Sequence, residues 1–186
     1  MAADGFTRAA GGARLAMLAD ALTLLRLGVA LVFPWCLARG GFGPLALFGV
    51  AALTDYTDGP LARRAGRDAK HGAILDVAAD VTFVLLGLGS AAALGLVTWA
   101  APAAVVVSVT AYVTASVRLA PRSEGPRLAR SRLGHAAGVG NYVLVGFACG
   151  AVALPGSLWP PLLGLAGALV TALNLAAVAA RFLPRS

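Results

Sequence analysis

The chain has 186 residues, of which 59% are apolar and only 12% are charged, and its formal net charge is +7. Soluble domains usually carry about 25% charged residues, so this composition excludes an ordinary soluble domain and predicts an integral membrane protein. The positive charge does not indicate nucleic acid as a partner, because the arginines lie between apolar runs rather than along one soluble face.

Six apolar segments follow one another along the chain, at 18–38, 42–62, 72–96, 98–118, 133–154 and 158–181. Each has about the 20 residues that a helix needs to cross a hydrocarbon core of about 30 Å. We therefore predict an all-α integral membrane fold, with six transmembrane helices in one domain over residues 18–186. Residues 1–17 are predicted to be a cytoplasmic N-terminal segment that includes a short interfacial helix over 5–17.

The basic residues predict how the spans are oriented, because cytoplasmic loops carry an excess of Lys and Arg. If the N-terminus lies inside, the outside loops hold only Arg39. Apart from Arg26 within the first span, the other basic residues then fall at the two termini and in the cytoplasmic connections after the second and fourth spans. We expect a cytoplasmic membrane of bacterial or archaeal type, with both termini on the cytoplasmic side.

Four aspartates lie in the apolar chain, at the predicted cytoplasmic ends of the second and third spans: Asp55, Asp58, Asp76 and Asp80. Each carboxylate within a membrane costs about 2.5–3.5 kcal/mol, so cations are expected among them. Residues three or four apart share one face of a helix, which predicts two acidic stripes facing each other. Four ionised aspartates would be neutralised by two divalent ions, and oxygen ligands favour Mg²⁺ or Mn²⁺. The site should open toward the cytoplasm.

Three other interpretations of these acids compete with the metal site. The aspartates could be paired with Arg63, Arg64 and Arg67. They could belong to an intramembrane prenyltransferase, which also needs acids and magnesium, or to a divalent cation transporter. A transporter predicts acids spread across the depth of the membrane, whereas these cluster on one side.

One stretch of the chain resembles a family signature at every defined position. It reads Asp55-x2-Asp58-Gly59-x2-Ala62-Arg63-x8-Gly72-x3-Asp76-x3-Asp80, and it resembles that of the CDP-alcohol phosphatidyltransferases. The resemblance implies transfer of a phosphatidyl group from a CDP-linked lipid such as CDP-diacylglycerol to an alcohol, with release of CMP, in phospholipid synthesis. It also implies a homodimer.

The resemblance also implies roles for single residues. Asp55, Asp58, Asp76 and Asp80 would hold the two ions, and Asp80 would also be the general base on the attacking hydroxyl. A base is needed because an alcohol is a weak nucleophile. The nucleotide site would be lined by Asp58, Gly59, Ala62, Arg63 and Gly72.

The first span adds two more residues to the expected nucleotide site. The stretch from Asp20 to Arg26 looks like the family's Asn-x-Leu-Thr-x-x-Arg segment, in which Asp20 replaces Asn and Thr23 matches. Asp20 and Thr23 are therefore candidate nucleotide contacts. Asp20 could alternatively act as a fifth acid or pair with an arginine such as Arg26.

The sequence says less about the acceptor alcohol than about the CDP-linked donor. Arg118, Arg132 and His135 lie at the cytoplasmic ends of the fourth and fifth spans and are candidate contacts for a phosphorylated alcohol. Positive-inside anchoring explains such arginines equally well. Some relatives that use glycerol 3-phosphate carry Gly-Lys-x-Lys-Thr near this point, but this chain reads Ser131-Arg132-Leu133-Gly134-His135. Asn141, inside the fifth span, could face the acceptor or join two helices.

Overall fold

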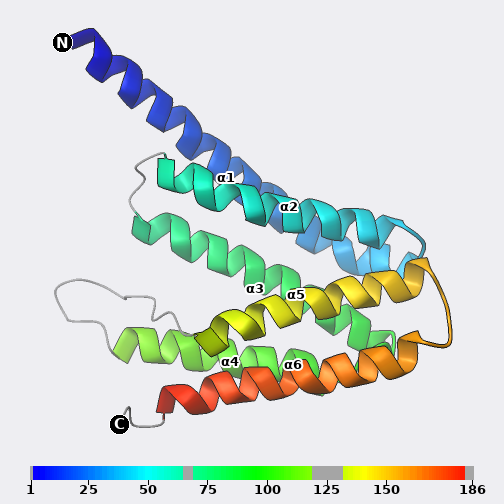
Figure 1. Ribbon diagram of the computed structural model, residues 1–186. Helices are drawn as coiled ribbons and strands as arrows, with labels where there is room; N and C mark the ends of the chain where they lie inside the picture. Colours follow the sequence, from blue (N-terminus) through cyan, green and yellow to red (C-terminus); the bar gives the residue numbers. More distant parts are fainter. Residues whose placement is uncertain (1, 65–68, 119–131, 183–186) are drawn as a thin grey trace. The chain divides into compact units, whose positions relative to one another are not determined.

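A computed structural model describes the backbone of residues 2–64, 69–118 and 132–182, and the side chains of 17, 18, 20–57, 75–116 and 132–182. All regular secondary structure in this part of the chain is helical (Figure 1). The helices are α1 (Ala2–Arg39), α2 (Gly43–Arg64), α3 (Ala69–Ala93), α4 (Ala100–Arg118), α5 (Arg132–Ala153) and α6 (Trp159–Phe182). The chain divides into two compact units, Met1–Leu86 and Gly87–Ser186.

The helices match the predicted segments closely, with one difference. From α2 to α6 both ends lie within three residues of the prediction. The helix expected over 5–17 is not a separate element, because α1 continues from Ala2 into the first span without a break. Its N-terminal part extends beyond the end of α2 (Figure 1). The placement of this part at the membrane interface stays a prediction.

Within the described residues, four helical stretches are long and apolar enough to cross a membrane: Asp20–Arg39, Leu75–Ala93, Arg132–Ala153 and Trp159–Phe182. The described apolar part of α4, Ala100–Ser116, is shorter. Helix α2 is less apolar because its second half carries Asp55, Asp58, Arg63 and Arg64. An all-helical fold with several membrane-spanning helices is therefore confirmed, while the count of six spans stays a prediction.

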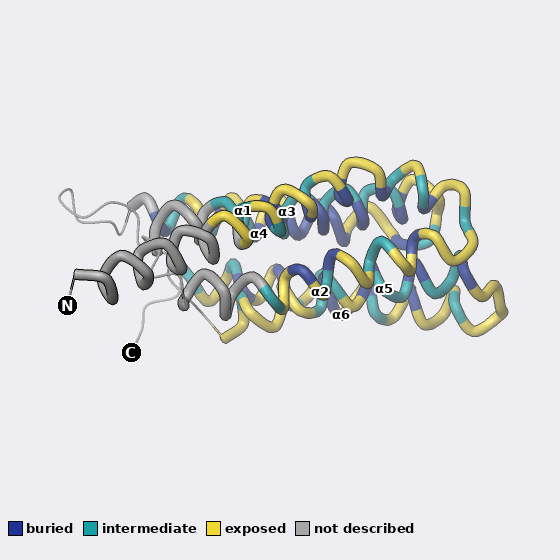
Figure 2. Tube along the Cα trace, turned by 90° about the horizontal axis from the view of Figure 1, so that it is seen from above, coloured by how far each residue is buried: buried dark blue, intermediate teal, exposed yellow. Residues whose placement is uncertain are grey.

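Exposed and buried positions alternate along the helices (Figure 2), and many of the exposed positions carry large apolar side chains. Leu31, Leu53 and Leu165 are 73%, 64% and 72% exposed. Burying such a side chain is worth about 1.5–3 kcal/mol, so this exposure would be costly in water. Lipid tails cover such positions at no such cost, as expected for a membrane protein.

In the first unit α1 packs against α2 and contacts α3. The α1–α2 connection is short because Gly40 and Gly41 adopt φ values of 73° and 72°, which side chains rarely tolerate. Phe33 and Phe83, both fully buried, meet edge to face with ring centroids 5.1 Å apart. This contact holds α1 next to α3.

In the second unit α6 packs against both α4 and α5. The buried Asn174 amide donates to Asn141 Oδ1 at 2.9 Å and also to the Val170 carbonyl. Trp159 lies over Gly150, where an added Cβ would be 2.6 Å from the indole ring. A small residue is therefore required at position 150 for α5 and the start of α6 to approach this closely.

Candidate functional site

The first unit gathers polar residues from three helices. Helix α2 carries Asp55 and Asp58, α3 carries Asp76 and Asp80, and α1 contributes Thr23 and Arg26. The two residues of each pair are three or four positions apart, so each pair occupies one face of its helix. The contacts of Arg26 and Thr23 show how these faces meet.

Arg26 joins the acids of α2 and α3. Its Nη1 donates to Asp80 Oδ1 at 2.7 Å and lies 3.5 Å from Asp55 Oδ1. The Arg26 side chain is fully buried, whereas those of Asp55 and Asp80 are 47% and 33% exposed. A buried guanidinium requires anionic partners. Asp55 and Asp80 therefore converge on one point although they come from different helices.

Thr23 makes the second link between α1 and α3. Its fully buried hydroxyl donates to Asp76 Oδ1 at 2.8 Å. Thr23 and Arg26 are three residues apart on α1, and their partners Asp76 and Asp80 are four apart on α3. Thr23 and Arg26 of α1 thus contact Asp76 and Asp80 of α3, respectively, over about one helical turn. Each contact orients a carboxylate before any ligand binds.

The donor chemistry of the site fits a hard divalent ion. The acids offer only oxygen ligands, which Mg²⁺ and Mn²⁺ prefer, and Asp55 and Asp80 already converge around a positive charge. Among the described side chains, no three acidic, histidine or cysteine groups are gathered closely enough to hold an ion. Asp58, the fourth predicted ligand, has a side chain outside that described set.

Several predicted nucleotide contacts also lie outside the described side chains. The backbone places Gly59, Ala62 and Arg63 in the last turns of α2 and Gly72 in the first turn of α3. Asp20 is half-buried on α1, six residues before Arg26. The proposed pairing of the acids with Arg63, Arg64 and Arg67 falls on side chains that are not described.

The predicted acceptor residues lie in the second unit. Arg132 and His135 are exposed in the first turn of α5, and Arg118 ends α4 with a side chain outside the described set. Asn141 is bound to Asn174 of α6, so of its two proposed roles the structure supports the one of joining helices.

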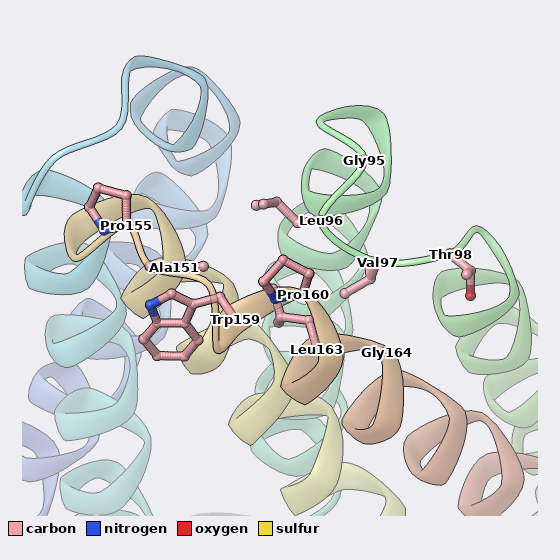
Figure 3. A pocket seen from close by; sticks show the side chains of 11 residues that line it. Gly95, Leu96, Val97, Thr98, Ala151, Pro155, Trp159, Pro160, Leu163 and Gly164 are labelled. Atoms are coloured by element: carbon pink, nitrogen blue, oxygen red, sulfur yellow. The ribbon is translucent and has the colours of Figure 1, made fainter.

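A cavity of about 380 Å³ lies in the second unit, between the loop after α3 and the start of α6 (Figure 3). Its lining is mostly apolar and includes Leu96, Val97, Pro160 and Leu163, with Trp159 at one wall. The Trp159 indole donates to the Leu154 carbonyl. None of the predicted site residues lines this cavity.

The family model for CDP-alcohol phosphatidyltransferase matches residues 16–180. This chain belongs to the CDP-alcohol phosphatidyltransferase family. The match covers α2 to α5 in full, α1 from residue 16 onward and α6 up to residue 180, and it includes the acids, Thr23 and Arg26. It confirms the predicted family, and with the apolar helices it confirms an integral membrane protein.

Curated relatives of this chain match over shorter stretches. Proteins of two Mycobacterium tuberculosis strains, named probable phosphatidylglycerophosphate synthase, are 40% identical over 97 residues, which is 48% of this chain and 46% of each relative. A Cereibacter sphaeroides protein named CDP-diacylglycerol–glycerol-3-phosphate 3-phosphatidyltransferase is 42% identical over 76 residues, 36% of this chain and 33% of that protein. The matches therefore span half or less of the relatives' length. No solved structure matches significantly.

Arg26 is the site residue that sequence reasoning did not assign. The sequence shows it only as the last residue of a family-like segment and as one possible partner for Asp20. The available signal was its position three residues after Thr23, which puts an arginine and a hydroxyl on one face of an apolar helix. The family assignment gives no support to the prenyltransferase and transporter interpretations.

Proposed function

We propose that this phosphatidyltransferase moves a phosphatidyl group from a CDP-diacylglycerol-type lipid to a phosphorylated alcohol and releases CMP, with glycerol 3-phosphate as the first acceptor to test. The observation that carries the proposal is the convergence of Asp55 and Asp80, from two helices, on Arg26. The family match supports the donor. The names of the Mycobacterium and Cereibacter relatives support the acceptor.

In the proposed reaction the acceptor hydroxyl oxygen attacks the phosphorus that bears the diacylglycerol. The new O–P bond forms as the bond to CMP breaks, and CMP leaves with the electron pair. The hydroxyl proton passes to Asp80, whose carboxylate is one-third exposed and therefore accessible to a hydroxyl. CMP is a phosphate monoester with a second pKa of about 6, so it leaves without a strong acid.

The ions would be held by Asp55, Asp58, Asp76 and Asp80. When bound, two Mg²⁺ or Mn²⁺ ions would neutralise the diphosphate and polarise the reacting oxygens. Thr23 would keep Asp76 oriented through its hydrogen bond. Asp20, Gly59, Ala62, Arg63 and Gly72 stay predicted nucleotide contacts, and a guanidinium such as that of Arg63 suits the diphosphate because it can contact two oxygens.

For the acceptor, we propose that Arg118, Arg132 and His135 contribute to binding its phosphate. The chain lacks the Gly-Lys-x-Lys-Thr segment that some relatives carry, but it places Arg132 and His135 at that point. Both are exposed and therefore open to an anion. We also propose that the protein has six spans and forms a homodimer. Both termini and the opening of the site would lie on the cytoplasmic side. The distribution of arginines supports the orientation.

The decisive assay gives the purified enzyme radiolabelled CDP-diacylglycerol with glycerol 3-phosphate, inositol phosphate, inositol, serine or phosphatidylglycerol, each with and without EDTA. We expect CMP release with glycerol 3-phosphate, its loss in EDTA, and recovery with Mg²⁺ or Mn²⁺. Full turnover in EDTA would reject the metal. Transfer only to another acceptor would reject glycerol 3-phosphate, and transfer to none would reject the activity.

A further inference from the structure

The environment of Arg26 has a consequence for how the site binds metal. Its guanidinium is fully buried, and the same nitrogen contacts acids from two helices, at 2.7 Å to Asp80 and 3.5 Å to Asp55. Both acids are predicted metal ligands. A positive charge is thus part of the site before any ion arrives.

We propose that Arg26 is a positioning residue that competes with the divalent ion for Asp80 and Asp55, and so sets how tightly the site binds metal. This inference rests on the proposed function, because it assumes that these acids hold the ions. A carboxylate oxygen that accepts a charge-assisted hydrogen bond at 2.7 Å has less electron density to offer an ion. The ion must also overcome repulsion from the guanidinium.

The same contacts also arrange the acids of the site relative to one another. Asp55 and Asp80 converge, and their like charges would repel each other if nothing lay between them. Arg26, on α1, supplies the positive charge that offsets this repulsion. Thr23 holds Asp76 on the adjacent turn of α3. The acids stay arranged and half-accessible, so metal can enter a preformed site.

The test is binding of Mn²⁺ to the metal-stripped full chain in detergent, without lipid substrate, measured from the electron paramagnetic resonance signal of free Mn²⁺. We expect Arg26→Gln to bind Mn²⁺ at least about 10-fold more tightly than the wild type, because a competing positive charge is removed. Arg26→Lys should shift affinity in the same direction by a smaller factor, because an ammonium lacks the planar fork of a guanidinium.

Thermal unfolding gives a second readout. In EDTA, Arg26→Gln should have a lower Tm than the wild type, since Asp55 and Asp80 lose their counter-ion. Mn²⁺ should raise its Tm by more than it raises that of the wild type, because tighter binding stabilises more. Arg39→Gln is the matched control: it removes the same charge from α1, but its guanidinium lies over Trp35, 3.7 Å from the ring centroid. Its Mn²⁺ affinity should equal that of the wild type.

A role for Arg26 in holding the helices together, and nothing more, predicts the opposite result. Mn²⁺ binding would then weaken in Arg26→Gln and Arg26→Lys as the acids lose their arrangement. Equal or weaker affinity in either folded variant overturns the inference while leaving the proposed function intact. If the wild type itself binds no Mn²⁺, the metal dependence in the proposed function fails and this inference fails with it.

Discussion

Arg26 and Asp80 lie 54 residues apart in the sequence, yet the arginine Nη1 is 2.7 Å from the aspartate Oδ1. Asp55 approaches the same nitrogen from α2. This relationship makes α1 a part of the acidic site, whereas the signature itself covers only α2 and α3. It also shows how a membrane helix can carry a buried arginine, because the charge is matched by acids within reach of the guanidinium.

Replacing Asp80 by Asn tests the proposed base. The amide cannot accept the hydroxyl proton and is a poor ligand, so CMP release should fall by about 10²–10⁴-fold. The protein should still insert in the membrane, because a neutral side chain is less costly there. The measurement is release of CMP from CDP-diacylglycerol by purified protein. Glu124→Gln removes a carboxylate outside the signature and should keep wild-type turnover. Full turnover in Asp80→Asn would show that another group is the base.

Replacing Thr23 by Val removes one hydroxyl at nearly constant volume. The hydroxyl donates to the Asp76 carboxylate, and hydrogen bonds to charged groups are worth about 1.5–3 kcal/mol. We expect the Mg²⁺ concentration for half-maximal activity to rise by about 10-fold, because Asp76 is no longer held in place. Thr110→Val is the control, since its hydroxyl donates to the Val106 carbonyl of its own helix. An unchanged Mg²⁺ requirement would mean that the hydroxyl does not orient a ligand.

The helices were largely predictable because apolar length alone decides them. A segment of about 20 apolar residues in lipid must satisfy its backbone internally, which only a helix can do within one segment. The sequence predicted a helix over 5–17 but not its continuity with the first span, because the charged and glycine-containing stretch before residue 18 does not show by composition that the two helices join. Helix α1 runs without a break from Ala2.

The site was predictable in part for a similar reason. Spacing of three and four placed Asp55 with Asp58 and Asp76 with Asp80, because that spacing is a local property of a helix. The contact of Arg26 with Asp80 depends instead on the register in which α1 packs against α3. That register follows from side-chain packing such as Phe33 on Phe83, and no local pattern in the sequence contains it.

The Asn141–Asn174 pair gives a test of packing in the second unit. Both amides are buried, and Asn174 donates to Asn141 Oδ1 at 2.9 Å. Polar pairs between membrane helices average about 0.6 kcal/mol and reach about 1.7 kcal/mol. A double-mutant cycle with Asn141→Leu and Asn174→Leu should give a coupling energy in this range. Thr171→Val serves as a control, because its hydroxyl bonds to the Gly167 carbonyl of its own helix. Strictly additive effects would show that the pair adds nothing to stability.

The acceptor site is tested by changing Arg132. Its side chain is exposed at the start of α5, so an anion in water can reach it, and a guanidinium suits a phosphate because it can contact two oxygens. If it binds the acceptor's phosphate, Arg132→Gln should raise the KM for glycerol 3-phosphate by about 5- to 10-fold. The KM for CDP-diacylglycerol should stay unchanged, because a residue used only for acceptor binding affects only that step. Arg39→Gln supplies the charge-matched control. Equal increases in both KM values would point to a general effect on the fold. No increase in either KM would mean that Arg132 does not bind the acceptor and serves as a cytoplasmic anchor.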